Sequence, residues 1–191
     1  MKKINFKEIA KDVIETEIKS LKKLKLNINK SFDKVVEAIL SCKNGKVIIS
    51  GVGKSGIIGK KISSTFASVG IPSFFIEGGN FSHGDSGSVT ARDVMCIYSN
   101  SGETNEIKKV IAYCTKIGTK IISICQKKNS TLSKASDVNI LVPASKEAGL
   151  PLLPTTSTTS FLAISDALAV ALLNKKKFGL YDFKLRHQEG C

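Results

Sequence analysis

The feature that most constrains this chain is a regular alternation of short apolar runs with helical stretches, which begins after residue 45. The apolar runs are rich in β-branched residues and are Val47–Ser50, Ser73–Ile76, Val94–Tyr98, Lys120–Cys125 and Val138–Val142. The helical stretches between and after them lie near Ser55–Val69, Glu103–Ile117, Thr131–Ala135 and Ser157–Leu173. Continuous apolar strands separated by helices indicate a parallel sheet covered on both faces. The sequence therefore predicts an α/β fold, a doubly wound parallel five-stranded sheet flanked by helices.

The N-terminal part of the chain has a different pattern. From about Asn5 to Cys42, apolar residues recur at steps of three and four among lysines and glutamates, which is the periodicity of amphipathic helices. A second helix is predicted to start near Ser31 and to end at Asn44-Gly45. We therefore divide the chain into residues 1–45, N-terminal helices that pack on the domain or on a neighbouring subunit, and residues 46–191, a single α/β domain.

The strong positive charge does not by itself indicate a nucleic-acid partner. The formal net charge is +13, but the basic residues are nearly all lysine, and Arg92 and Arg186 are the only arginines. Arginine makes most of the bidentate contacts with bases, and the lysines here are scattered without an aromatic platform. Because a basic surface also attracts anionic metabolites, we expect a small anionic partner and no nucleic acid.

The sequence carries no pattern typical of targeting, disulfide or metal-binding segments. No run approaches the ~18 apolar residues of a membrane span, and the charged stretch Met1–Ile14 lacks the apolar centre of a signal peptide. We therefore expect a cytoplasmic protein with no membrane partner. The five cysteines form no CxxC pair, and the two histidines, His83 and His187, lack metal-ligand spacing. The sequence predicts no disulfide framework, no metal site and no cofactor.

Three loops after predicted strands are candidates for a ligand site, because open parallel sheets bind ligands at the carboxyl ends of their strands. The first is Gly51–Gly56, Gly-Val-Gly-Lys-Ser-Gly. It fits the dinucleotide pattern G-x-G-x-x-G, with Glu77 where a ribose-binding acid would lie. A P-loop is excluded, because its leading glycine would fall at Ile48 inside a strand. The glycines suit any tight turn, while Lys54 and Ser55 suggest that side chains contact a polar ligand.

The other two loops are rich in hydroxyl groups at predicted helix starts. Ser99–Thr104 reads Ser-Asn-Ser-Gly-Glu-Thr, and Thr155–Ser160 consists of six hydroxyl residues in a row. A helix N-terminus offers free N–H groups and a positive dipole end, so hydroxyls beside it can help to hold an anion. The alternative role is N-capping, for which a single residue would suffice. In combination, the three loops predict a shared site for a small anion.

These loops and several further motifs resemble one known family, the SIS (sugar isomerase) domain, whose fold is flavodoxin-like. More specifically, they resemble the arabinose-5-phosphate isomerases over a stretch from about Val47 to His187. The further matching motifs are Phe66-Ala67-Ser68, Pro72-Ser73-Phe74-Phe75, His83-Gly84-Asp85, Lys146-Glu147-Ala148, Thr158-Thr159 and Asp166-Ala167-Leu168-Ala169-Val170-Ala171-Leu172.

The resemblance implies an activity, partners and a set of site residues. Enzymes of this family interconvert D-ribulose 5-phosphate and D-arabinose 5-phosphate for synthesis of Kdo, a sugar of lipopolysaccharide and some capsules. They need no cofactor and are usually homotetramers. By motif, the residues that carry activity are Lys54, Glu106, Glu147 and His187. The implied substrate-binding residues are Gly53, Ser55, His83, Ser99, Asn100, Ser101 and Thr104.

The sequence departs from the family pattern in two places. Most relatives continue into a pair of CBS modules, whereas this sequence resembles the short forms that lack them. The usual His-Pro-Gly-Gly near the C-terminus is replaced by His187-Gln188-Glu189-Gly190. The loss of the proline and a glycine bears on the orientation of His187.

The candidate residues have roles that suit this isomerisation. Moving a carbonyl between C1 and C2 through a cis-enediol requires a base beside the carbon and a group that stabilises charge on oxygen. Glu106 and Glu147 are the two candidate bases, and a carboxylate screened from water can have its pKa raised towards neutrality. Lys54 can stabilise the enediolate oxygen or neutralise the phosphate, and His83 or His187 can open the ring or relay a proton.

Three other functions compete with this one. A sugar-phosphate sensor could use the same domain without catalysis, although the lysine-rich N-terminal helices do not suggest a DNA-binding helix-turn-helix. A nucleotide-binding oxidoreductase would explain the G-x-G-x-x-G pattern together with Glu77. An isomerase of a different sugar phosphate, with six or seven carbons, would use the same scaffold.

Overall fold

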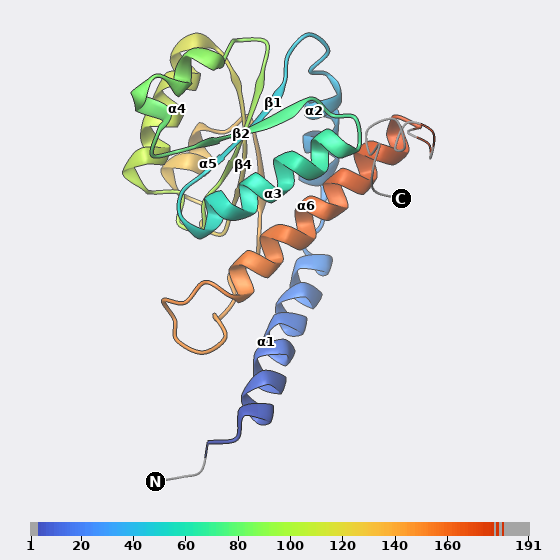
Figure 1. Ribbon diagram of the computed structural model, residues 1–191, viewed down its shortest axis with the longest axis vertical. Coiled ribbons are helices and arrows are strands. Elements are labelled where there is room, and N and C mark those ends of the chain that lie inside the picture. Colours follow the sequence, from blue (N-terminus) through green and yellow to red (C-terminus); the bar gives the residue numbers. More distant parts are fainter. Residues whose placement is uncertain (1–3, 178, 180, 182–191) are drawn as a thin grey trace.

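The fold is built around one parallel sheet, shown in the computed structural model of Figure 1, which describes residues 4–177, 179 and 181. The strands are β1 (Val47–Gly51), β2 (Ser73–Glu77), β3 (Val94–Tyr98), β4 (Lys120–Cys125) and β5 (Val138–Leu141). They pair in parallel in the order β2-β1-β3-β4-β5. The predicted five-stranded parallel sheet is confirmed, and each strand ends within one residue of its predicted bounds.

Helices cover both faces of the sheet, as the doubly wound prediction requires. One face carries α2 (Lys30–Leu40), α3 (Lys54–Ser68) and α6 (Thr156–Lys175), and the other carries α4 (Asn105–Ile117) and α5 (Thr131–Ala135). Two short 3-10 helices, η1 (Phe81–His83) and η2 (Asp85–Ser88), follow β2.

The two helical layers explain why the strands are apolar throughout. Successive side chains of a strand point to opposite faces of the sheet. In β3, Cys96 and Tyr98 belong to the core under α3 and α6, whereas Met95 and Ile97 belong to the core under α4. Every residue of β1 and β3 is buried, so these strands lack the alternation of polar and apolar residues that marks a half-exposed sheet.

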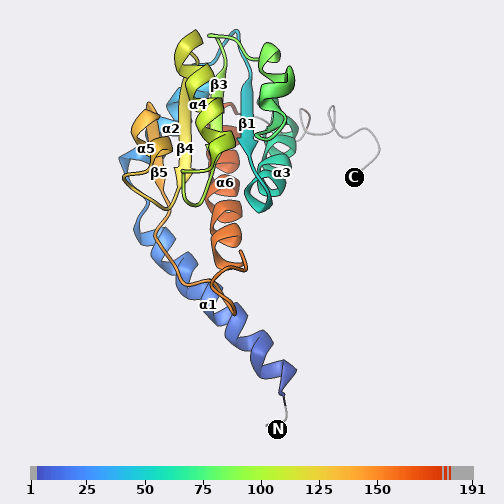
Figure 2. The ribbon, with the colours of Figure 1, turned by 90° about the vertical axis from the view of Figure 1, so that its left-hand side faces the viewer.

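Helix α1 (Phe6–Leu26) extends beyond the sheet, as two perpendicular views show (Figures 1 and 2). Its C-terminal half packs on α6, and the Ser20 hydroxyl shares a hydrogen bond of 3.1 Å with the hydroxyl of Ser160. Only Ser20 and Leu24 of this helix are buried. The N-terminal half therefore lies outside the core of the domain.

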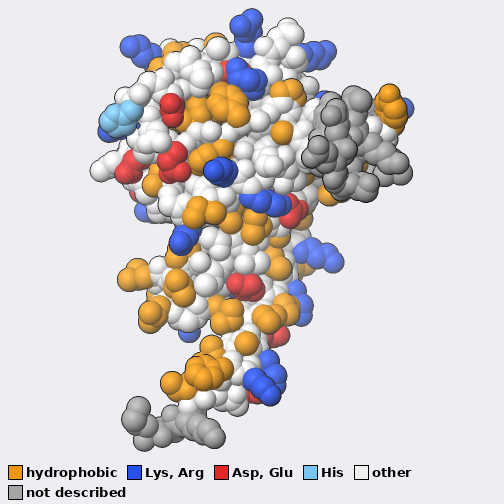
Figure 3. All heavy atoms as spheres, viewed as in Figure 1, with side chains coloured by type: hydrophobic (Ala, Val, Ile, Leu, Met, Phe, Trp, Pro, Cys, Tyr) orange, Lys and Arg blue, Asp and Glu red, His pale blue; other side chains and the backbone are white. Residues whose placement is uncertain are grey.

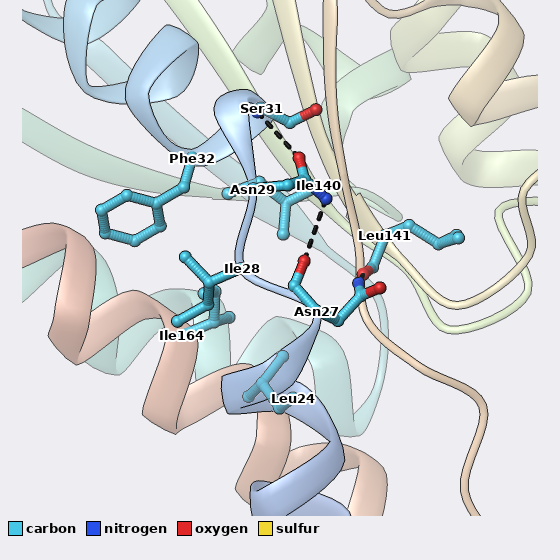
Figure 4. A pocket seen from close by; sticks show the side chains of 9 residues that line it. All are labelled: Leu24, Asn27, Ile28, Asn29, Ser31, Phe32, Ile140, Leu141 and Ile164. Carbon is cyan, nitrogen blue, oxygen red and sulfur yellow. Dashed lines mark hydrogen bonds between the residues drawn. The ribbon is translucent and has the colours of Figure 1, made fainter.

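Two asparagines fix the turn between α1 and α2 (Figure 4). Asn27 Nδ2 donates a hydrogen bond of 2.6 Å to the carbonyl of Leu141, which ties the turn to the end of β5. Asn29 is the N-cap of α2, and its Oδ1 accepts from the Ser31 N–H at 2.9 Å. These bonds explain why the second helix begins at Lys30, next to the predicted start.

Helix α6 is long and apolar enough to cross a membrane by length and composition alone. However, 50% of the most apolar stretch of this helix is buried inside the protein. Its buried side chains, which include Phe161, Leu168 and Leu172, belong to the main core cluster. The composition of α6 is therefore that of a helix in the core of a folded domain.

Asp93 links the starts of the two central strands. Its carboxylate accepts hydrogen bonds from the Lys46 N–H at 2.7 Å, the Thr90 N–H at 2.7 Å and the Thr90 hydroxyl at 2.9 Å. Burial by itself would raise the pKa of Asp93, but these hydrogen bonds outweigh it and hold the pKa below its ordinary value. Asp93 thus fixes the residue before β1 to the turn before β3.

We expect Asp93→Asn to lower the free energy of unfolding at pH 7 by about 2 kcal/mol, because hydrogen bonds to a buried charge are lost. A depressed pKa stabilises the fold above the ordinary aspartate pKa, and this stabilisation disappears as the pH falls through the folded value. The difference from the native protein should therefore shrink below about pH 4. Urea unfolding at pH 7 and below about pH 4 measures this difference in the free energy of unfolding, with the exposed Asp33→Asn as control. A difference of the same size at both pH values would contradict a stabilising charge on Asp93.

Candidate functional site

The topology of the sheet marks one place for a ligand. The chain leaves β1 towards β2 and leaves β3 towards β4, although β1 and β3 are neighbours. The loops that follow β1 and β3 therefore diverge, and they open a crevice at the carboxyl ends of these two strands. Gly51 and Tyr98, the last residues of the two strands, lie opposite each other in the register.

A cavity occupies this crevice and joins the first two predicted loops. Val52 and Ser55 contribute to its wall from the β1–α3 side. The β3–α4 side contributes Tyr98, Ser99, Asn100, Ser101 and Thr104. Five predicted substrate-binding residues are therefore brought together, which are Ser55, Ser99, Asn100, Ser101 and Thr104.

The hydroxyls of the β3–α4 loop divide into those that hold the loop and one that stays free. Ser99 is buried, and its Oγ accepts a hydrogen bond of 3.0 Å from the Gly102 N–H. Ser101 Oγ accepts from the Glu103 N–H at 3.3 Å. Thr104 is the N-cap of α4 but makes no side-chain capping bond, and it is exposed. Its hydroxyl is therefore available to a ligand at the start of α4.

The sequence did not reveal that α5 supports this loop. Glu103 accepts hydrogen bonds of 2.9 Å from both the N–H and the hydroxyl of Thr131, and it pairs with Lys108 at 3.3 Å. The bonds from Thr131, together with Lys108, lower the pKa of Glu103 to about 2. Gly102, with φ +65°, packs against Ser130, the N-cap of α5.

We expect Gly102→Ala to destabilise the protein by about 1–3 kcal/mol, because the positive φ strains any other residue. The added Cβ would also stand 2.7 Å from the Ser130 Cβ. Gly87→Ala is the matched control, because no atom lies within 4 Å of its added Cβ and its φ is not positive. Urea unfolding of both variants tests this, and equal stability of the two would show that the loop does not depend on Gly102.

The glycines of the β1–α3 turn are explained by close packing. Gly53, the N-cap of α3, has φ +58° and ψ −128°, a conformation that side chains disfavour. A Cβ at Gly56 would stand 2.9 Å from Glu77 Oε2 and 3.0 Å from the Gly51 carbonyl oxygen. The structure thus accounts for the G-x-G-x-x-G pattern by the approach of α3 to β1 and to Glu77, without a dinucleotide.

Lys54 and Glu106 flank the cavity without lining it. Lys54 is the first residue of α3 and is exposed. Glu106 lies in the first turn of α4 and is half-buried. The two residues lie in the first turns of the helices whose N-termini face the cavity, so a carboxylate and a cation are found near its two sides.

Glu147 and the third hydroxyl loop form a separate cluster at the start of α6. Glu147 Oε2 accepts hydrogen bonds from the N–H groups of Thr155 at 2.9 Å and Ser157 at 3.2 Å, and from the Thr155 hydroxyl at 3.2 Å. The Thr158 hydroxyl donates to the Thr155 carbonyl. Within the chain as described, these hydroxyls serve the fold of the α6 start, and the cavity is lined by the first two loops.

The pKa of Glu147 moves opposite to our expectation for a base. Burial raises it, but the hydrogen bonds from Ser157 and Thr155 outweigh burial and hold the pKa below its ordinary value. The expected rise towards neutrality is wrong for this carboxylate, because it caps a helix. One signal in the sequence could have indicated this capping role. Glu147 is an acid that stands eight residues before Thr155, in a segment that leads into a run of hydroxyl residues.

His83 is not part of the cavity wall. His83 is exposed at the end of η1, in the connection that follows β2. His187 lies outside the described residues. In the part of the chain that the structure covers, no three His, Cys, Asp or Glu side chains are grouped to hold a metal ion.

Comparison with known proteins points to one family. The model of the SIS domain matches residues 39–171. The chain is 45% identical to arabinose 5-phosphate isomerase KdsD of Yersinia pestis and 43% identical to KdsD of Escherichia coli K12, over 98% of its own length. It covers 57% of the length of each relative. The chain therefore spans little more than half of these curated relatives.

A solved structure is similar over its whole length. The protein c3406 of Escherichia coli CFT073, in complex with arabinose 5-phosphate, is 38% identical and superimposes with a TM-score of 0.92. The match covers 96% of the present chain and 100% of that one.

Proposed function

Because this chain belongs to the SIS domain family, we propose that it is a sugar-phosphate isomerase that interconverts D-arabinose 5-phosphate and D-ribulose 5-phosphate. The observation that supports this is the cavity at the carboxyl ends of β1 and β3, where Ser55, Ser101 and Thr104 meet beside two helix starts. We propose further that the product serves Kdo synthesis, as the likeness to KdsD suggests.

The start of α4 is the anchor for the phosphate. Its N–H groups and dipole favour an anion, and the exposed Ser101 and Thr104 add hydroxyl donors without a fixed charge. Ser99 contributes by holding the loop in shape through Gly102. A phosphate bound there places the sugar carbons across the cavity, towards the β1–α3 turn.

Glu106 is the base in this proposal, and Lys54 is its electrostatic partner. Glu106 lies in the first turn of the helix that anchors the phosphate, two residues after Thr104, and this proposal places its carboxylate beside the substrate. Glu147, in contrast, already accepts three hydrogen bonds at the start of α6. Lys54 is placed to stabilise negative charge on the enediolate oxygen as the proton leaves carbon.

The activity is tested by incubating the purified protein with ribulose 5-phosphate and measuring arabinose 5-phosphate. We expect turnover, with kcat reduced about 10²- to 10⁴-fold in Glu106→Gln because the proton acceptor is lost. Glu37→Gln, a change of an exposed acid on α2, is the matched control. Turnover that survives in Glu106→Gln but disappears in Glu147→Gln would assign the base to Glu147 instead.

The same experiment separates catalysis from sensing. Thermal stabilisation by sugar phosphates without any turnover would favour a non-catalytic regulator. Turnover of a six- or seven-carbon sugar phosphate in preference to ribulose 5-phosphate would keep the reaction class and change the substrate.

We also propose that the protein self-associates as a homotetramer, and that one of the interfaces of the tetramer is the apolar surface at the end of the molecule where α1 projects (Figure 3). Eight exposed apolar side chains gather there, which are Ile4, Phe6, Ile9, Ile14, Ile18, Leu150, Leu152 and Leu153. Each of these side chains can contribute on the order of 100 Å². Their combined area therefore approaches the area that each partner buries in a stable interface, which is about 800 Å².

The charges of α1 favour a second copy of the chain as the partner. Within α1, Lys11 pairs with Glu8 at 2.9 Å and Lys19 pairs with Glu15 at 3.6 Å. Lys7 near the start of the exposed half and Glu17 near its end have no such ion pair among the described residues. An antiparallel pairing of two copies sets Lys7 of each copy opposite Glu17 of the other, as an isologous interface requires. The exposed half of α1 carries more acids than lysines, whereas a membrane-surface helix is rich in lysine and arginine.

We expect Ile9→Asp and Leu152→Asp to reduce the mass of the assembly in light scattering, because an acid in an apolar interface is costly. Ala91→Asp, an equivalent change at an exposed position in the turn before β3, should leave the mass unchanged. A native protein that is monomeric, or variants with native mass, would contradict this interface.

A further inference from the structure

Two helix starts flank the cavity, but a sugar phosphate carries only one phosphate. Both α3 and α4 direct their N-termini to the carboxyl ends of β1 and β3, and each N-terminus attracts an anion. A phosphate bound at α3 would reverse the substrate in the cavity. A further feature of the structure must therefore determine which of the two helix starts binds the phosphate.

Glu77 distinguishes them. It is the last residue of β2 and pairs with Gly51 of β1 in the strand register. The backbone N–H of Gly53, the N-cap of α3, interacts with its carboxylate and lowers its pKa, although burial outweighs this effect and raises the pKa above its ordinary value. Its two oxygens lie 2.9 Å and 3.3 Å from the position of a Cβ on Gly56. The carboxylate is therefore packed against the first turn of α3.

The start of α4 is not occupied in this way. Thr104 makes no side-chain capping bond. Within the described part of the chain, the Glu106 carboxylate accepts no hydrogen bond from the backbone of α4, although it lies in the first turn. The two helix starts thus differ in one respect that matters for a phosphate. The start of α3 already holds a carboxylate, that of Glu77, whereas the start of α4 does not.

We propose that Glu77 is a positioning residue that occupies the anion place at the start of α3 and leaves the start of α4 to the phosphate. The substrate is then bound in a single orientation, with its carbonyl end towards Lys54. This role rests on the proposed function, because it presupposes a sugar-phosphate ligand. This role also explains why residue 56 is a glycine, since any larger residue would displace the Glu77 carboxylate.

Two variants separate the charge of Glu77 from its bulk. Glu77→Gln keeps an acceptor for the Gly53 N–H and fills the space beside Gly56, so we expect it to retain the native orientation. Glu77→Ala empties the place and exposes the start of α3. Glu37→Ala, which removes an exposed acid from α2, controls for the change in net charge.

The first measurement is binding of inorganic phosphate to the full chain, followed by the backbone amide signals in nuclear magnetic resonance. In the native protein and in Glu77→Gln, we expect phosphate to shift the amides of Thr104–Ile107 and not those of Gly53 and Lys54. In Glu77→Ala, both sets should shift. Shifts of Gly53 and Lys54 in the native protein, or their absence in Glu77→Ala, would overturn the proposal.

The second measurement is steady-state kinetics with ribulose 5-phosphate. Reversed binding ties up the enzyme without reaction, so kcat and KM of Glu77→Ala should fall by the same factor, about two-fold or more, with kcat/KM unchanged. A lower KM with native kcat would mean that Glu77 only repels the substrate. A lower kcat/KM would mean a merely structural role, and either result would overturn the proposal.

The two measurements also keep this inference apart from the proposed function. Absence of turnover in the native protein would contradict the isomerase, while the amide shifts of Glu77→Ala would still decide the role of Glu77. Turnover with native amide shifts in Glu77→Ala would contradict the role of Glu77 alone.

Discussion

The pairing of β1 with β3 is the interaction on which the rest of the site depends. These strands are separated in sequence by a whole βα unit, yet they are neighbours in the sheet, with Gly51 opposite Tyr98. Because the chain leaves them in opposite directions, the loops that follow cannot pack on each other. The cavity is a consequence of this divergence, and the helix starts that flank it are fixed by the same two strands.

Much of the polarity near the cavity holds the structure in place. Ser99 closes its own loop through Gly102, and Glu103 attaches that loop to α5. Glu147 caps α6 in a similar way. Such bonds restrict the loops before any ligand arrives, which lowers the entropy lost on binding. The side chains left for a ligand are few, and Thr104 at the start of α4 is the clearest of them.

In the N-terminal helix, the sequence pattern predicts an apolar side but not what covers it. The apolar residues of α1 recur with the period of an amphipathic helix, but the domain buries only Ser20 and Leu24 of this helix. Phe6 and Ile9 lie on the same helical side as Leu24 yet remain exposed. A helix of this length gains most of its stability from packing, so its apolar side is the natural place for another copy of the chain.

The sequence by itself determined the order and type of the elements, because buried parallel strands must be apolar throughout and their helices must be amphipathic. It also located the two loops that line the cavity, since helix starts after such strands carry glycine and hydroxyl residues for physical reasons. Only the tertiary structure decided which of these residues act together. Ser55 and Thr104 meet in one cavity, whereas Glu147 and the Thr155 hydroxyl support the start of α6. That division depends on strand order and on hydrogen bonds between distant segments, which no local pattern records.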